Sequence, residues 1–191
     1  MREARDKYFD INGFGVDGGY SDAWVDFHIG PLYCPFPNTK SRIRAVKVHD
    51  LHHILTGYQT DFIGELEIGA WEVGAGCKDF AAAWFLNLSS LGAGVLFAPS
   101  RVYRAFIRGR STDSLYGRPL DDMLGRTVAE MRRDTNVDAS APEASFADRV
   151  AFAGYAVAGL AVSAVAASIG VFVVPVGLVT GLVRKLRRAP A

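Results

Sequence analysis

The sequence has little charge of either sign and few cysteines, and both shortages exclude classes of protein. Lys and Arg number 21 and Asp and Glu number 20, so the formal net charge is only +1. Such a balance excludes a protein that binds nucleic acid non-specifically through a basic surface, and we expect no nucleic-acid partner. The two cysteines, Cys34 and Cys77, are far apart and form no C-x-x-C pair, which excludes a zinc knuckle and a disulfide framework. A reducing compartment follows as the simplest expectation.

The first fifteen residues, MREARDKYFDINGFG, have no apolar stretch of the kind found in a secretory signal. We therefore expect the N-terminal part of the protein to stay in the cytoplasm. A chain of 191 residues can hold one well-packed domain and an appendage.

Composition divides the chain into four regions of a mainly α protein. Residues 1–44 are rich in glycine and aromatic residues and predict an irregular N-terminal region, whereas 45–137 carry helical patterns. Residues 138–148 are polar and predict a linker. Residues 149–191 form an apolar segment with a basic end, for which we expect a membrane-associated helix or helical hairpin.

The strongest chemical signal is the segment HDLHHILTGYQTDFIGE, residues 49–65, which contains three of the four histidines. Just before and within it, Val48, Leu51 and Leu55 recur at helical spacing and share one face. Gly57 is a plausible end for this helix. Thr60 or Asp61 can then cap a second helix, so the sequence predicts a helical hairpin.

Four residues of this hairpin are the predicted metal ligands. At 100° per residue, His49, Asp50 and His53 lie within an arc of roughly 100° opposite the apolar face. His49 and His53 are four residues apart, a spacing that lets two imidazoles reach one ion, and Glu65 would arrive from the second helix. Asp50 could be a ligand or could orient a histidine ring. A site with few protein ligands leaves a position open for a substrate oxygen or water.

Other polar residues nearby have competing interpretations. His52 projects away from His49 and is assigned to packing or surface, and His28 is assigned a structural role. Glu67 and Glu72 compete with Glu65 for the inward position. The basic stretch KSRIRAVK, residues 40–47, is either a solvated helix start or a group that captures an anionic part of a substrate.

Two apolar stretches bear on the membrane. Residues 80–100 carry no charge, but Asn87, Ser89, Ser90 and Pro99 interrupt them, which favours a buried helix over a membrane span. Residues 150–183 are 34 positions without a charge. As one helix they would measure about 51 Å, against a hydrocarbon core of about 30 Å.

The long segment 150–183 therefore has three interpretations. A single tilted span with an interfacial flank is one, and a re-entrant hairpin that bends near Ser168, Gly170 and Pro175 is another. Basic residues flank both ends, so a hairpin fits the charges better if the metal-site domain is cytoplasmic. A buried hairpin in a soluble protein is the third interpretation.

The spacing His-Asp-x-x-His, eleven residues, then Glu, filled by His49, Asp50, His53 and Glu65, resembles the signature of the Coq-four family of coenzyme Q (ubiquinone) biosynthesis. The likeness extends through LTGYQTDFIGE, residues 55–65, and more weakly through YRAFIRGR and PLDDMLGRTVAEMRRDTNV, covering about residues 42–137.

The resemblance implies a mostly helical fold with a divalent metal, zinc by expectation, held by these four residues beside an apolar cavity for a polyprenyl chain. The implied activity is processing of the C1 position of a prenylated hydroxybenzoate-type precursor, in which the ring carboxylate is removed and the same carbon is hydroxylated. Implied partners are that precursor or another isoprenoid lipid, the membrane and other proteins of quinone biosynthesis. The glycine-rich N-terminus and the apolar C-terminal segment depart from the family pattern.

Two other functions fit the sequence. One is a non-catalytic prenyl-lipid-binding scaffold for a biosynthetic complex, with a structural metal. The other starts from the His49-Asp50 dipeptide, which also occurs in HD-type metal phosphohydrolases. Those enzymes would need His28 and Asp113 or Asp121 as further ligands, and this interpretation leaves the spacing to Glu65 unexplained.

Overall fold

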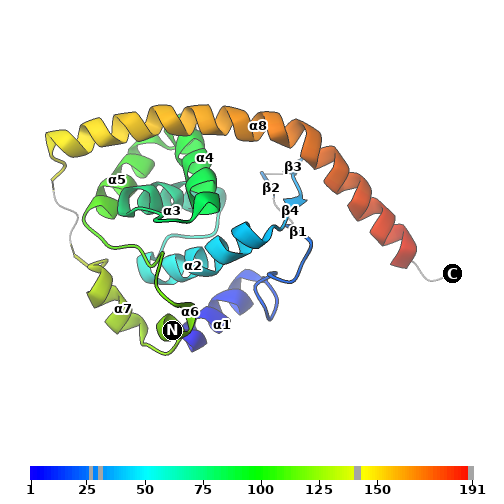
Figure 1. Cartoon of the computed structure of the whole chain (residues 1–191), viewed down its shortest axis with the longest axis horizontal. Coiled ribbons are helices and arrows are strands. Elements are labelled where there is room, and N and C mark those ends of the chain that lie inside the picture. The colour runs from blue at the N-terminus through cyan, green and yellow to red at the C-terminus, as the bar shows by residue number, and fades with distance from the viewer. Residues whose placement is uncertain (26–27, 30–31, 140–142, 189–191) are drawn as a thin grey trace.

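The computed structural model describes residues 1–25, 28–29, 32–139 and 143–188. In these ranges the protein is mainly α, as the sequence predicts (Figure 1). The helices are α1 (Arg2–Asn12), α2 (Lys40–Thr56), α3 (Phe62–Ala75), α4 (Ala81–Phe97), α5 (Pro99–Arg110), α6 (Leu120–Leu124), α7 (Val128–Thr135) and α8 (Phe146–Arg188). Two antiparallel strand pairs join β1 (Trp24–Val25) to β4 (Phe36–Pro37) and β2 (His28–Ile29) to β3 (Leu32–Tyr33).

The predicted hairpin is present as α2 and α3. The side chain of Thr39 caps α2 by accepting a hydrogen bond from the backbone N–H of Arg42, and α2 ends at Gly57 with a φ of 78°. Asp61 caps α3 by accepting from the N–H of Gly64. Because α2 already begins at Lys40, the basic stretch 40–47 forms its first two turns, and the predicted boundary at residue 44 falls inside this helix.

Helices α3, α4 and α5 pack closely around a core that contains Trp71, Leu91 and Phe106. Glycine makes this contact possible, since a Cβ on Gly109 would lie 2.2 Å from the carbonyl oxygen of Trp71. The segment 80–100 is therefore a helix of the domain, with Asn87 buried, as the sequence analysis favours.

The N-terminal region is less irregular than predicted, because α1 occupies its first part. Residues 2–12 contain neither glycine nor proline, and the chain leaves the helix at Gly13, whose φ is 68°. Composition averaged over residues 1–44 conceals this helix, since the glycines all follow it. The helix packs against α2, near the predicted metal ligands.

The C-terminal apolar segment is one continuous helix, so of the two alternatives left open for residues 149–191, a helix or a helical hairpin, the helix is the one observed. Pro175 lies inside α8, and its missing N–H removes one hydrogen bond without ending the helix. Gly170 and Ser168 adopt helical conformations as well. Helix α8 begins at Phe146, three positions before the predicted segment, where Ser145 and Asp148 exchange hydrogen bonds. Part of the predicted linker, residues 140–142, lies outside the described residues.

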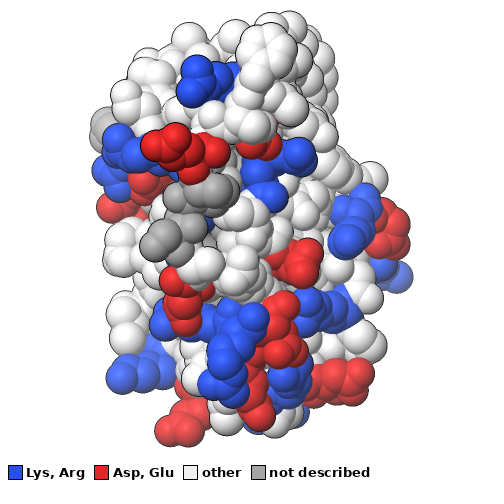
Figure 2. Space-filling model, turned by 90° about the vertical axis from the view of Figure 1, so that its left-hand side faces the viewer, with Lys and Arg blue, Asp and Glu red and all other residues white. Residues whose placement is uncertain are grey.

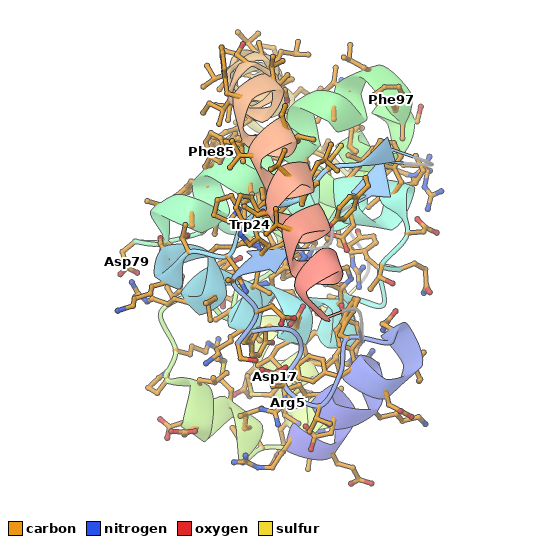
Figure 3. The ribbon with its side chains drawn as sticks, turned by 90° about the vertical axis from the view of Figure 1, so that its right-hand side faces the viewer. Arg5, Asp17, Trp24, Asp79, Phe85 and Phe97 are labelled. Carbon is orange, nitrogen blue, oxygen red and sulfur yellow. The ribbon has the colours of Figure 1, made fainter. Side chains whose placement is uncertain are left out.

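Within α8, residues Phe146–Gly181 are long and apolar enough to cross a membrane by length and composition, and their most apolar 18-residue window has a mean hydropathy of 2.4 and is 6% buried. In Figure 2 the charged side chains crowd the lower half of the face, and the top, where α8 lies, is mainly uncharged. In Figure 3, Phe85 of α4 lies beside α8, whereas Arg5 and Asp17 lie toward the bottom of the molecule.

Candidate metal centre

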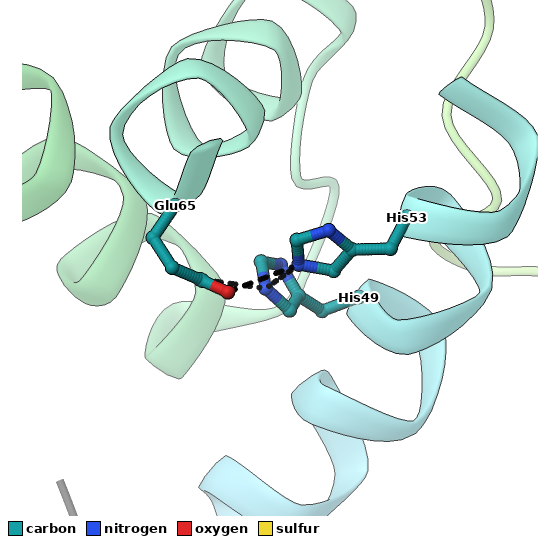
Figure 4. A group of neighbouring side chains, drawn as sticks. All are labelled: His49, His53 and Glu65. Atoms are coloured by element: carbon teal, nitrogen blue, oxygen red, sulfur yellow. Dashed lines mark hydrogen bonds and ion pairs between the residues drawn. The ribbon is translucent and has the colours of Figure 1, made fainter. Parts of the chain in front are cut away.

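Three of the four predicted ligands come together between α2 and α3 (Figure 4). The Nε2 atoms of His49 and His53 are 3.1 Å apart. The two carboxylate oxygens of Glu65 lie 3.3 Å from His49 Nε2 and 3.2 Å from His53 Nε2. One helical turn separates the histidines, and the hairpin brings Glu65 across from the next helix.

These separations fit a metal ion. Two nitrogens bound tetrahedrally at about 2.0–2.1 Å from zinc would be about 3.3 Å apart, close to the observed 3.1 Å. The donor set of two imidazoles and one carboxylate is one that zinc accepts, and it leaves a fourth position open. The side chain of Glu65 is 37% exposed, so the cluster lies at the surface on its carboxylate side.

Hydrogen bonds to the other ring nitrogens orient both imidazoles. Nδ1 of His53 lies 2.9 Å from the carbonyl oxygen of Tyr58 and must donate to it, which leaves a lone pair on Nε2. Nδ1 of His49 lies 2.9 Å from Glu72 Oε1 and donates to this carboxylate. Both Nε2 atoms then face one point together with Glu65, and their lone pairs repel unless a cation, either a metal ion or a proton, lies there.

The sequence analysis treated Glu72 as an alternative to Glu65 for the inward position, but the structure gives Glu72 another role. It is fully buried beneath His49, where its Oε1 accepts hydrogen bonds from His49 and from Nδ1 of His52 at 2.6 Å. Its Oε2 accepts from the Tyr116 hydroxyl at 2.6 Å and from Asn87. Glu72 is therefore the carboxylate that orients a ligand histidine, a role that the sequence analysis considered for Asp50.

The remaining polar residues near the hairpin are accounted for by other contacts. His52 is buried and accepts a hydrogen bond from the N–H of Leu115 at 2.8 Å, in agreement with a packing role. Glu67 pairs with Arg101 at the surface. The backbone of His28 lies in β2, but its side chain is outside the described residues.

Asp50, the fourth predicted ligand, is outside the three-residue cluster. Its Oδ2 accepts a hydrogen bond from the Tyr20 hydroxyl at 2.5 Å. The 100° turn from His49 to the next residue aims the Asp50 side chain toward the N-terminal region instead of toward α3. The structure thus brings together His49, His53 and Glu65, and it gives Asp50 another partner.

The electrostatics of the cluster favour a cation. Burial alone would lower the pKa of His49, but the carboxylates of Glu72 and Glu65 raise this pKa well above its ordinary value. Burial opposes ionisation of Glu65, yet hydrogen bonds from His49 and His53 lower its pKa to about 2. Burial also opposes ionisation of Glu72, but the charges of His49 and His52 hold its pKa well below the usual range. A positive charge between two ionised carboxylates is stabilised, whether it is a proton or a metal ion.

Two tyrosines of the N-terminal region complete the surroundings, and the sequence analysis missed both. The ring of Tyr8, from α1, stacks on His53 with centroids 5.7 Å apart. Tyr20 binds Asp50 as described above. The aromatic richness of residues 1–44 was the available signal, but it has no spacing that points to the histidines.

No protein-family model, curated protein or solved structure matches the chain.

Proposed function

We propose that the protein is a membrane-associated metalloprotein that binds one divalent ion, with zinc as the expected metal. The observation that carries this proposal is the convergence of His49, His53 and Glu65, with their donor atoms 3.1–3.3 Å apart. When bound, the ion supplies a Lewis acid that can hold a substrate oxygen and stabilise negative charge developing on it. Helix α8 gives the protein its affinity for membranes.

We further propose that the substrate is a prenylated precursor of a ubiquinone-like quinone. The motif resemblance supports this assignment, and so does the location of a polar site in a molecule with an extensive apolar surface. The proposed reaction releases the ring carboxylate as carbon dioxide and places a hydroxyl on the same carbon; because this is a two-electron oxidation, an external oxidant of the dioxygen class has to be a co-substrate that accepts the electrons and supplies the oxygen atom. In it, His49 and His53 hold the ion, Glu65 completes the site, and Glu72 fixes the orientation of His49.

A strain that carries Glu65→Ala tests the catalytic proposal through its lipids. The expected result is accumulation of a carboxylated quinone precursor, detected by mass spectrometry of extracted lipids. Glu67→Ala is the matched control, since Glu67 lies two residues away on α3 and pairs with Arg101 at the surface. Normal quinones in the Glu65→Ala strain would refute catalysis at this site.

The second candidate is a non-catalytic scaffold that presents prenyl lipids to other enzymes. The large hydrophobic side chains that α8 exposes favour it, because they offer a surface for lipids whether or not the metal site is active. Normal lipids combined with lost recovery of partner proteins in the Glu65→Ala strain would favour this function. The phosphohydrolase interpretation gains no support, since Asp50 binds Tyr20 and is not among the clustered residues.

A further inference from the structure

Helix α8 presents one face to the domain along most of its length. The residues on this face are at least partly buried, and they recur every three or four positions: Phe152, Tyr155, Gly159, Ser163, Ala166, Gly170, Val173, Gly177 and Thr180. This spacing is the helical repeat, so these residues share one face of α8. The face is not packed everywhere, since a Cβ on Gly170 would meet nothing within 4 Å. A helix that crossed a membrane without touching the domain would not need a face that packs against the domain.

The first half of α8 is held tightly against α4. A Cβ on Gly92 would lie 2.2 Å from the carbonyl oxygen of Gly159, so the two backbones touch where both residues are glycine. The hydroxyl of Ser163 donates to the carbonyl oxygen of Ser89 at 2.8 Å. Contacts this close bind α8 to the domain along a defined line.

Aromatic side chains and one ion pair secure the beginning of α8. Tyr155 stacks on Trp84 of α4, and Phe152 packs edge-on against Tyr103 of α5. Asp148 pairs with Arg110 at 3.1 Å.

A second contact lies further along α8, beyond Pro175. A Cβ on Gly177 would lie 2.6 Å from the Pro35 side chain and 3.0 Å from that of Trp24. Gly159 and Gly177 are 18 residues apart, which is about 27 Å of helix and nearly the thickness of a hydrocarbon core. If α8 crossed a bilayer while it kept both contacts, the domain surface between them would have to enter the hydrocarbon too.

The outer face of α8 is uncharged and mostly apolar in its middle part. Its exposed large side chains between residues 157 and 179 are Val157, Leu160, Val165, Ile169, Val171, Phe172, Val176, Leu178 and Val179. Phe85 of α4, which is also exposed, lies beside α8 (Figure 3). We call these ten residues the apolar face. A patch of this size on a protein surface marks an interaction site.

The ends of α8 indicate which partner the apolar face fits. Arg149 precedes the uncharged run, and RKLRR, residues 184–188, follows it. Basic residues at both ends suit the anionic head groups of a lipid leaflet. In Figure 1, α8 runs along the top of the molecule and then turns down, so its C-terminal end lies on the same side as the domain.

We propose that α8 lies in the plane of one membrane leaflet, with the apolar face in the acyl chains and the domain below it, and does not cross the bilayer. The protein is then monotopic, and both ends of α8 remain on the domain's side of the membrane. This inference does not depend on the metal or on its chemistry.

Single-cysteine labelling of the membrane-bound protein tests the inference. Cysteine is introduced at Glu3, Ala147 or Ala191 in a Cys34→Ser, Cys77→Ala background, and sealed vesicles of both orientations receive a membrane-impermeant maleimide. We expect all three positions to react in the same vesicle orientation. Reaction of the Ala191→Cys variant from the side opposite to Glu3→Cys would overturn the inference, and so would recovery of the protein without membranes.

A second measurement separates a membrane from a second copy of the chain as the occupant of the apolar face. Phe172→Asp is expected to lower co-sedimentation with phosphatidylethanolamine and phosphatidylglycerol vesicles by about tenfold or more. Val16→Asp is the control, because Val16 is fully exposed on the N-terminal loop outside the apolar face. Unchanged vesicle binding with lost self-association, measured by light scattering in detergent, would overturn the proposal in favour of a dimer.

Discussion

Glu72→Gln is the variant that tests how the structure holds its metal ligands. The side chain keeps its shape but loses its charge, and it offers one acceptor oxygen where Glu72 offers two. Its four partners are buried donors, on His49, His52, Asn87 and Tyr116. Asn87 and Tyr116 can turn to present an acceptor to the new NH2 group, so the network can rearrange around glutamine.

The size of the effect follows from these contacts. Loss of a carboxylate that orients a ligand histidine weakens metal binding about 10–100-fold, which is about 1.4–2.7 kcal/mol. Loss of charge-assisted hydrogen bonds should also cost about 1–3 kcal/mol of folding free energy. Glu72→Ala is less informative, because it would leave four buried donors without an acceptor at about 1–3 kcal/mol each. Their sum is comparable to the entire stability of a domain.

Competition titration against a fluorescent chelator, in detergent at fixed pH, measures the metal affinity of each variant. Glu67→Gln is the matched control on the same helix, since its ion pair with Arg101 lies at the surface, and we expect it to bind as the wild type does. Circular dichroism establishes that both variants are folded. Wild-type affinity in folded Glu72→Gln, or an equal loss in Glu67→Gln, would refute the role assigned to Glu72.

Three further predictions concern pH and packing. Because the pKa of His49 is raised, a metal ion must displace the proton from its ring. Metal affinity should therefore fall about tenfold for each pH unit below that pKa. Metal titrations that show no dependence on pH would contradict this. The pKa of Glu65 is lowered from 4.5 to about 2, so its ionised side chain stabilises the metal-free fold fully above pH 4.5. This contribution should be lost as the pH falls through 2. In acid titrations followed by circular dichroism, Glu65→Gln should lack this loss of stability. Gly159→Ala should destabilise the protein by about 1–3 kcal/mol in thermal unfolding, because its Cβ would meet the backbone of Gly92. Gly154→Ala should be neutral or stabilising, because a Cβ there meets nothing within 4 Å. Equal effects of the two substitutions would argue against the close contact with Gly92.

Local signals made the hairpin predictable. Gly57 and Asp61 are capping residues in the positions that their chemistry favours, and the spacing of His49 and His53 depends only on helix geometry. The N-cap of α2 was not predicted, although Thr39 caps this helix in the same way. The convergence of both rings with Glu65 needs only a short connection between two helices. These features could be predicted because each depends on residues close together in the chain.

Contacts between residues far apart in the chain could not be predicted from the sequence. Tyr20 donates a hydrogen bond to Asp50, which is 30 residues away in the sequence. Glu72, and not Glu65, is the buried carboxylate because Asn87 and Tyr116, from distant parts of the chain, donate hydrogen bonds to it. Helical periodicity alone treats Glu65 and Glu72 alike, since they are seven residues apart. The choice of one continuous helix for α8 also depends on distant contacts, because the inner face of α8 packs against α4 and β4. In a hairpin, this face would instead pack against the other half of the segment.

The metal content of the purified protein tests the central claim most directly. Inductively coupled plasma mass spectrometry of the wild type should find about one divalent metal per chain, which His49→Ala and His53→Ala should abolish. Asp50→Asn should keep the metal, because Asp50 binds Tyr20 and lies outside the cluster. A folded wild type without stoichiometric metal after reconstitution with zinc, or full occupancy in His49→Ala, would contradict the account.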